Sequence, residues 1–217
     1  MFEAATGLVL RTRLLTETSL IVHWLTPEFG RLATMAKGAR RPKSPFRGKL
    51  DLFYLTRFSF SRSRTSELHP LREVSVLETH GFLRQEIAYL QQAAYCANLI
   101  EQATETETPL GSMFQLICGL LRELPQHSPQ PQLILGFELK LLVELGLEPD
   151  LSQAHLTGGA KALIQNLEKA EWSGISRLRL NPAQLKELRL FLHGFLMFHL
   201  GRVPKGREAA LEDRKSR

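Results

Sequence analysis

Apolar and polar residues alternate along the first third of the chain with a period of two, which predicts β-strands. Leu8, Leu10 and Leu14, for example, are separated by valine and arginine. We expect five strands, over residues 8–14, 18–26, 31–37, 52–60 and 67–77. Because proline has no N–H for a sheet hydrogen bond, Pro70 is expected to interrupt or bend the fifth strand. Five short strands joined by basic loops suit a small closed β-barrel.

Beyond Glu78 the apolar residues recur every three or four positions, which is typical of amphipathic helices. Thr108 and Asn181 each precede a proline, so both are expected to cap the N-terminus of a helix. The apolar stripe of the first helix includes Ile87, and that of the last includes Phe198. We expect helices over residues 83–97, 109–124, 132–145 and 159–170, and from 182 onward.

These patterns predict the α+β fold class. An N-terminal OB-fold β-barrel over residues 1–78 is expected to be followed by an α-helical domain over residues 79–217. The chain is 43% hydrophobic and 23% charged, as in ordinary globular proteins. It has no apolar run of membrane-spanning length and no signal-peptide layout at its start. Two distant cysteines predict neither a disulfide framework nor a zinc site, and they fit a cytoplasmic, nucleoid-associated protein.

Charge is distributed unevenly along the chain. Residues 1–72 carry 13 basic and 5 acidic residues, a net charge of +8, whereas the remainder carries 15 and 17, a net charge of −2. The whole positive surplus therefore lies in the predicted barrel. Such asymmetry is typical of a polyanion-binding half joined to a scaffold half.

The densest basic segment is KGARRPKSPFRGK, Lys37 to Lys49, which contains no acid. Its glycines and prolines exclude a regular helix or a central strand. A cationic loop held between two strands can follow a phosphate backbone, although a solvated charge run is the ordinary alternative. The residues predicted to bind DNA are Arg11, Arg13, Lys37, Arg40, Arg41, Lys43, Phe46, Arg47 and Lys49.

Exposed aromatic rings on an OB barrel can stack on the bases of single strands. Phe46 is the strongest candidate because it lies inside the polar loop, but its ring could equally pack the loop onto the barrel. Trp24, Tyr54 and Phe58 are more typical of a barrel core. Stacking and packing therefore remain alternative interpretations of Phe46.

No pattern in the chain indicates catalysis, a cofactor or a metal site. Glu101, Glu105 and Glu107 are interpreted as a solvated helix end. The seven histidines form no paired-ligand motif, and His193 and His199 are interpreted as core residues of an apolar helix. The sequence accordingly predicts a protein that is not an enzyme.

Several spaced motifs resemble the RecO family of bacterial DNA repair and recombination mediator proteins. The N-terminal motifs are Gly7–Leu10, Glu17–Thr18, Leu25–Thr26, Gly30–Arg31, Ala36–Arg41 and Phe46–Leu50. The later motifs are Phe137–Leu139, Leu145–Gly146, Leu200–Arg202 and Lys205–Arg207. Many members of the family carry a four-cysteine zinc module near the position of residues 150–165. That segment contains no cysteine here, so no zinc site is expected.

The resemblance implies the OB-barrel and helical-domain fold together with a set of activities. It implies binding of single- and double-stranded DNA, annealing of complementary strands, and assistance to RecA, together with RecR, in displacing single-strand-binding protein. By the same resemblance Lys37, Arg40, Arg41 and Lys43 would contact DNA. The helical domain would dock the acidic, phenylalanine-ended tail of single-strand-binding protein, with cations available at Arg84, Arg122, Lys140 and Arg177.

Two other function classes remain open from the residues alone. One is an OB-fold RNA-binding factor, because a cationic loop does not by itself distinguish DNA from RNA. The other is a protein-interaction adaptor whose basic loop meets an acidic partner.

Overall fold

The computed structural model describes residues 2–152 and 154–212. Contacts divide the chain into two compact units. The first unit contains Met1–Gly81 and Glu105–Phe114, and the second contains Phe82–Thr104 and Gln115–Arg217. The first unit thus takes in residues 105–114, which lie well beyond the boundary expected after residue 78.

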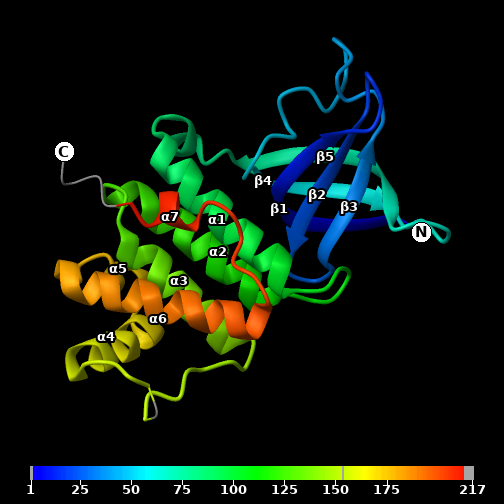
Figure 1. Ribbon diagram of the computed structural model, residues 1–217. Helices are drawn as coiled ribbons and strands as arrows, with labels where there is room; N and C mark the ends of the chain where they lie inside the picture. Colours follow the sequence, from blue (N-terminus) through cyan, green and yellow to red (C-terminus); the bar gives the residue numbers. More distant parts are fainter. Residues whose placement is uncertain (1, 153, 213–217) are drawn as a thin grey trace. The chain divides into compact units, whose positions relative to one another are not determined.

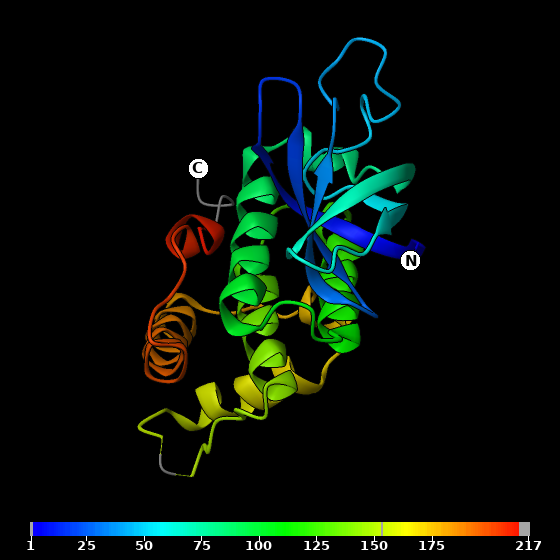
Figure 2. The ribbon, with the colours of Figure 1, turned by 90° about the vertical axis from the view of Figure 1, so that its right-hand side faces the viewer.

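The first unit is a five-stranded barrel, as the alternating pattern predicts. Its strands are β1 (Phe2–Leu14), β2 (Leu20–Thr26), β3 (Gly30–Ala36), β4 (Leu55–Ser61) and β5 (Leu68–Glu78). They close in the order β1-β2-β3-β5-β4, and only β3 and β5 run parallel. This is the strand order of an OB-type barrel, and with the helices that follow it the α+β fold class is confirmed. Figures 1 and 2 show the strands curving around a common centre.

β5 is continuous through Pro70, so the proline does not interrupt the strand. Residues 68–70 pair in parallel with β3, and residues 71–78 pair antiparallel with β4. Pro70 therefore lies where the strand changes partners to close the barrel. The missing N–H is tolerated there because one ladder ends and the other begins.

A β-bulge in β1 interrupts the alternation of inward and outward side chains that the sequence predicts for that strand. The register with β2 shifts between Val9 and Arg11, so Val9 points into the core while Arg11 and Arg13 share the outer face. Leu14, expected on the apolar face, is 65% exposed at the strand end. The bulge separates the inward side of Val9 from the outward side of Arg11, and Arg13 follows Arg11 by ordinary alternation.

Aromatic rings fill the centre of the barrel. Trp24 stacks on Phe58 with ring centroids 4.1 Å apart, and its indole N–H donates to the Thr34 hydroxyl at 2.8 Å. Phe60 lies beside Phe58. The interpretation of Phe58 as a core residue is thereby confirmed, since Phe58 and Phe60 are buried and Arg57 is exposed.

The remainder of the described chain is helical. It forms η1 (Gly81–Arg84), α1 (Ile87–Ala103), α2 (Gly111–Glu123), η2 (Leu124–Gln126), α3 (Pro131–Glu144), α4 (Gly158–Lys169), α5 (Trp172–Ile175), α6 (Pro182–Leu200) and α7 (Arg207–Ala210). Asn181 caps α6 as predicted, in a capping box with Gln184. Thr108 does not cap α2, because that helix begins three residues later, at Gly111.

The predicted apolar faces of α1 and α6 need correction, whereas α3 is buried more widely than a single face. Ile87 is 54% exposed, because α1 buries a different stripe that includes Tyr95 and Cys96. α3 is buried on almost every side, since other helices surround it. Phe198 is 84% exposed on α6, and His193 and His199 lie on the exposed surface of that helix instead of in a core.

A buried charge network joins three helices of the second unit. Glu138 of α3 accepts two hydrogen bonds from the Arg207 guanidinium of α7, at 2.7 and 2.8 Å. The Tyr95 hydroxyl of α1 donates to the same carboxylate at 2.5 Å, and burial raises the pKa of that phenol. Glu138 is 0% and Arg207 4% exposed, so water solvates neither charge. Each charge is therefore stabilised by the other.

Replacing Arg207 with Ala is expected to destabilise the protein by about 3–5 kcal/mol, because the Glu138 carboxylate would stay buried without its cation. Removing both charges together, with Glu138→Leu and Arg207→Met, should recover most of that loss. The measurement is thermal and denaturant unfolding followed by helical circular dichroism.

The matched control is Arg189→Ala, which breaks the solvent-exposed ion pair between Arg189 and Glu208. It should cost about 1 kcal/mol or less. Equal losses for the Arg189 and Arg207 variants would contradict a special role for the buried network.

Candidate nucleic-acid interface

The cationic segment Lys37–Lys49 forms a chain of tight turns between β3 and β4. Successive backbone hydrogen bonds link residues three apart, from Ala39 N–H to Ala36 O through to Lys49 N–H to Phe46 O. Gly38 and Gly48 adopt φ values of 66° and 72°, a left-handed conformation that favours glycine. The turns give the segment a defined path and leave its long side chains pointing outward.

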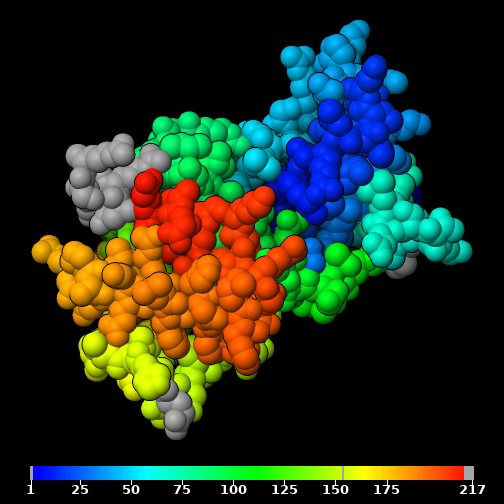
Figure 3. Space-filling view, in the orientation of Figure 1, coloured from blue at the N-terminus to red at the C-terminus, as the bar shows by residue number. Residues whose placement is uncertain are grey.

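This cationic loop is braced by the turn between β1 and β2. Arg40 N–H donates to Thr18 O at 2.9 Å, and Gly38 N–H donates to the Ser19 hydroxyl at 3.1 Å. The Arg40 guanidinium also donates to Glu17 O at 2.9 Å. Figure 3 shows the two segments side by side at one end of the barrel. Together they form one surface, although they are separated by about twenty residues in the sequence.

The six cations of the loop are available to an anionic ligand. Five are exposed and Lys49 is half-buried. Within residues 2–152 and 154–212, none of the six forms an ion pair with a carboxylate. The structure thus gathers six uncompensated charges on one braced loop, which are Lys37, Arg40, Arg41, Lys43, Arg47 and Lys49.

Phe46 anchors this loop to the barrel. Its side chain is 7% exposed and belongs to the cluster that contains Trp24 and Phe58, as does Ala39. At this exposure the ring is too buried for a base to stack flat against it, which favours the packing interpretation over stacking. Trp24 and Phe58 are core residues as well, whereas Tyr54 is only partly buried.

A second basic surface lies on the outer face of β1, β2 and β3. Arg11 pairs with His23, and Arg31 lies on β3, the neighbouring strand of the same sheet. Burial is the largest cause that lowers the pKa of His23 to about 4. The positive charges of Arg11, Arg13 and Arg31 contribute the rest of that decrease. His23 is therefore neutral at pH 7 among three arginines. The sequence did not identify it, since its role depends on strand register.

The cations that follow β4 do not all extend this basic surface. Arg62 donates to both oxygens of Glu3, at 2.8 and 3.1 Å, and to Glu107 at 2.9 Å. Its hydrogen bonds hold the pKa of Glu3 below the usual value. Glu107 also contacts buried His69 at 3.0 Å. The expectation that Glu107 belongs to a solvated helix end is therefore wrong.

Glu107 reaches the barrel because its segment forms an extra bridge to β3. Thr106 pairs with Arg31, and Glu107 N–H donates to Arg31 O at 2.8 Å. A Cβ atom at Gly30 would lie 1.7 Å from Thr108 O, so the close approach requires glycine there. Glu3 and Glu107 thus neutralise Arg62, which lies outside the cationic loop.

Side chains suited to metal binding do not cluster in the described ranges. No three His, Cys, Asp or Glu residues among them are placed to hold a metal ion. Burial raises the pKa of Cys118 to about 11, and it also raises the pKa of Cys96 well above its usual value. Neither thiol is therefore a ready nucleophile. No helix of the described residues is both long and apolar enough to cross a membrane.

Comparison with known proteins gives a consistent family assignment. Residues 1–80 match the family described as recombination protein O N terminal, and residues 84–160 match recombination protein O C terminal. The DNA repair protein RecO of Exiguobacterium sibiricum is 30% identical over 162 residues, which cover 75% of this chain and 64% of the relative. Less than two thirds of that relative is therefore spanned.

Two relatives are matched over more of their length. The DNA repair protein RecO of Bacillus pumilus is 28% identical over 94% of this chain and 81% of the relative. That of Bacillus subtilis is 28% identical over 98% of this chain and 85% of the relative.

The depressed pKa of His23 can be measured by following its ring carbons in an NMR titration. We expect a pKa of about 4, with the imidazole neutral at pH 6. Arg13→Gln should raise the pKa because it removes one positive charge that disfavours protonation. Burial, the larger cause, should still keep the value below the ordinary 6.5.

Arg64→Gln is the matched control, since Arg64 is not among the charges that act on His23. It should leave the titration unchanged. A pKa near 6.5 in the unmodified protein would show that the face is neither buried nor strongly positive.

Proposed function

Because the chain belongs to the RecO family of DNA repair proteins, we propose that it binds single- and double-stranded DNA as a recombination mediator. Its cationic loop, Lys37–Lys49, holds the phosphate backbone, and Arg11 and Arg13 extend the contact. The observation that carries the proposal is a loop, anchored by Phe46, whose six exposed or half-buried cations have no carboxylate partner among the residues that the structure describes.

The proposed mechanism makes and breaks no covalent bond. Two DNA strands repel one another through their phosphates, and cations bound along one strand lower that repulsion. Base pairing then supplies the free energy for annealing. In the same way the protein helps RecA, with RecR as a partner, to replace single-strand-binding protein on DNA in the cytoplasm.

Family membership favours DNA over the two alternative functions. An OB-fold RNA-binding factor would use the same phosphate contacts, and a protein adaptor would use the loop to meet an acidic partner. Mobility-shift assays with DNA, RNA and an acidic peptide side by side would separate the three functions.

We further propose a docking site for the phenylalanine-ended tail of single-strand-binding protein in the second unit. A pocket of about 500 Å³ lies between α6 and α7, with Leu185 and Leu190 among its apolar walls. Lys186 and Arg189 line it as cations. Such a pocket suits an aromatic anchor next to a terminal carboxylate.

The four cations expected to be available for this tail do not line the pocket. Lys140 donates to Glu168 O at 2.8 Å, and Arg122 donates to Cys118 O at 3.3 Å. Arg84 and Arg177 are exposed elsewhere on the second unit.

The loop assignment predicts a strong salt dependence of DNA binding. If the loop neutralises about four phosphates, affinity for single strands should fall on the order of 50-fold between about 50 and 200 mM salt. Replacing Arg40, Arg41 and Lys43 with Ala should reduce that fall to about 3-fold, because roughly one neutralised phosphate remains. Fluorescence anisotropy of a labelled oligonucleotide measures both.

A control with the same change in net charge replaces the exposed cations Lys169, Arg177 and Lys205 of the second unit with Ala. It should retain the salt slope of the unmodified protein. If the loop variant and this control behave alike, the loop is not the DNA-binding site.

The docking proposal predicts that a fluorescent acidic peptide ending in phenylalanine binds the full chain. Leu190→Ala should weaken binding about 5- to 30-fold, as for an apolar contact at the centre of an interface. Phe198→Ala is the control, because Phe198 is exposed on the same helix but does not line the pocket. Equal effects of the two substitutions, or binding that survives removal of the terminal phenylalanine, would contradict the docking site.

A further inference from the structure

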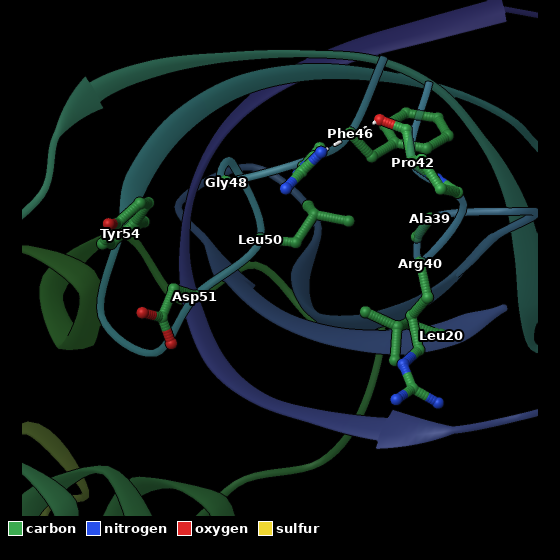
Figure 4. Close-up of a pocket in the computed structure, with 10 residues that line it drawn as sticks. Leu20, Ala39, Arg40, Pro42, Phe46, Gly48, Leu50, Asp51 and Tyr54 are labelled. Atoms are coloured by element: carbon green, nitrogen blue, oxygen red, sulfur yellow. Dashed lines mark hydrogen bonds between the residues drawn. The ribbon is translucent and has the colours of Figure 1, made fainter. Parts of the chain in front are cut away.

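A hollow of about 480 Å³ opens between the cationic loop and the end of the barrel. Its apolar walls come from β2, from the loop and from the segment that leads into β4. Figure 4 shows Tyr54 and Asp51 on one side of the hollow, and Pro42, Ala39 and Arg40 on the other. The volume lies within the range of small-ligand sites.

Packing against the core and backbone hydrogen bonds hold the walls of the hollow in place. Leu20, Leu50 and Tyr54 are partly buried, with one side packed against the barrel core, and all three line the hollow. Tyr54 is held by a short ladder to Val9, in which Val9 N–H donates to Tyr54 O at 3.0 Å and Phe53 N–H donates to Val9 O at 2.8 Å. The cavity is therefore preformed, and Ala39, Pro42 and Phe46 of the loop form part of its apolar wall.

Two guanidinium groups stand among the lining residues of the hollow. Arg40 donates to Glu17 O at 2.9 Å, and Arg47 donates to Pro42 O at 3.2 Å. Each contact uses one of the five N–H donors of the side chain, and neither arginine has a carboxylate partner within the described residues. Both side chains are thus positioned by neutral carbonyl groups, with donors left for phosphate oxygens.

Asp51 indicates which part of a nucleic acid would enter. Asp51 is one of the residues that line the hollow, and its carboxylate accepts a hydrogen bond from Leu52 N–H at 2.8 Å. A negative side chain disfavours a phosphate inside the hollow but can accept an N–H bond from the exocyclic amino group of a base. The interior of the hollow therefore suits a base, whereas Arg40 and Arg47 suit phosphate groups.

We propose that this hollow receives one unstacked nucleobase of a single DNA strand, whose adjacent phosphates lie on Arg40 and Arg47. The inference rests on the proposed DNA binding and adds to it a site for a base. The base packs against Leu20, Leu50 and the ring of Tyr54. A base in a duplex must first be unpaired and unstacked, whereas a base in a single strand is already accessible.

The hollow gives the loop a preference that its charges cannot provide. Phosphates of single and double strands both meet the six cations, but only a single strand gains the base contact at little cost. The protein consequently holds a single strand by its backbone and by one base, and leaves the neighbouring bases free to pair.

The experiment measures the affinity of the full chain for three ligands of equal length. They are a single-stranded oligonucleotide, the same backbone made entirely of abasic sites, and a duplex. Binding of the normal strand should exceed that of the abasic strand by about 5- to 150-fold, the range for contact between one base and an aromatic side chain. Leu50→Trp, which fills the hollow without changing charge, should reduce this ratio to about 2-fold or less and keep duplex affinity.

A second pair of variants covers the case in which Leu50→Trp fails to fold. Tyr54→Ala should lower the ratio because it removes the ring, and Tyr54→Phe should preserve it because the ring remains. Circular dichroism checks the fold of each variant.

The outcomes distinguish this inference from the proposed function. Equal, salt-dependent binding of normal and abasic strands would overturn the base site while leaving DNA binding by the loop intact. Absence of salt-dependent binding to any of the three ligands would refute the proposed function itself. Displacement of the strand by free dCMP at equal concentrations of nucleotide would show a mononucleotide site and would also overturn the inference.

Discussion

The anchoring of Phe46 in the barrel core is the interaction on which the candidate interface depends. Six like charges on a segment rich in glycine and proline would repel one another and favour a disordered loop. Burial of the Phe46 ring and of Ala39 holds the segment down, and the hydrogen bonds to Thr18 and Ser19 set its direction. The aromatic core around Trp24 thus fixes the loop as well as the barrel, and the hollow beneath the loop exists because of it.

The acids of the first unit complement this arrangement by their position. Glu3 and Glu107 bind Arg62 and help to join residues 105–108 to the barrel, whereas none of the six loop cations pairs with a carboxylate of the described residues. Positive charge is therefore neutralised where it supports the fold and left uncompensated where a polyanion could bind.

The second unit uses charge differently. Its central ion pair, Glu138 with Arg207, is buried and hydrogen-bonded, and it joins α3 to the short α7 that forms one wall of the α6–α7 pocket. Buried pairs of this kind contribute little net stability but strongly favour one geometry when both partners are present. The near-neutral charge of this unit also agrees with a role in holding protein partners.

The sequence by itself determined the five strands, the capping of α6 by Asn181 and the basic segment 37–49, because each depends on neighbours along the chain. Local periodicity also established the α+β class. It did not determine the phase of β1 beyond the bulge, the exposure of Ile87 and Phe198, or the contact of Glu107 with Arg62. Those features depend on which distant residues meet. The hollow lined by Leu20, Leu50 and Tyr54 is likewise a product of the tertiary structure, since three separate segments must converge before its shape exists.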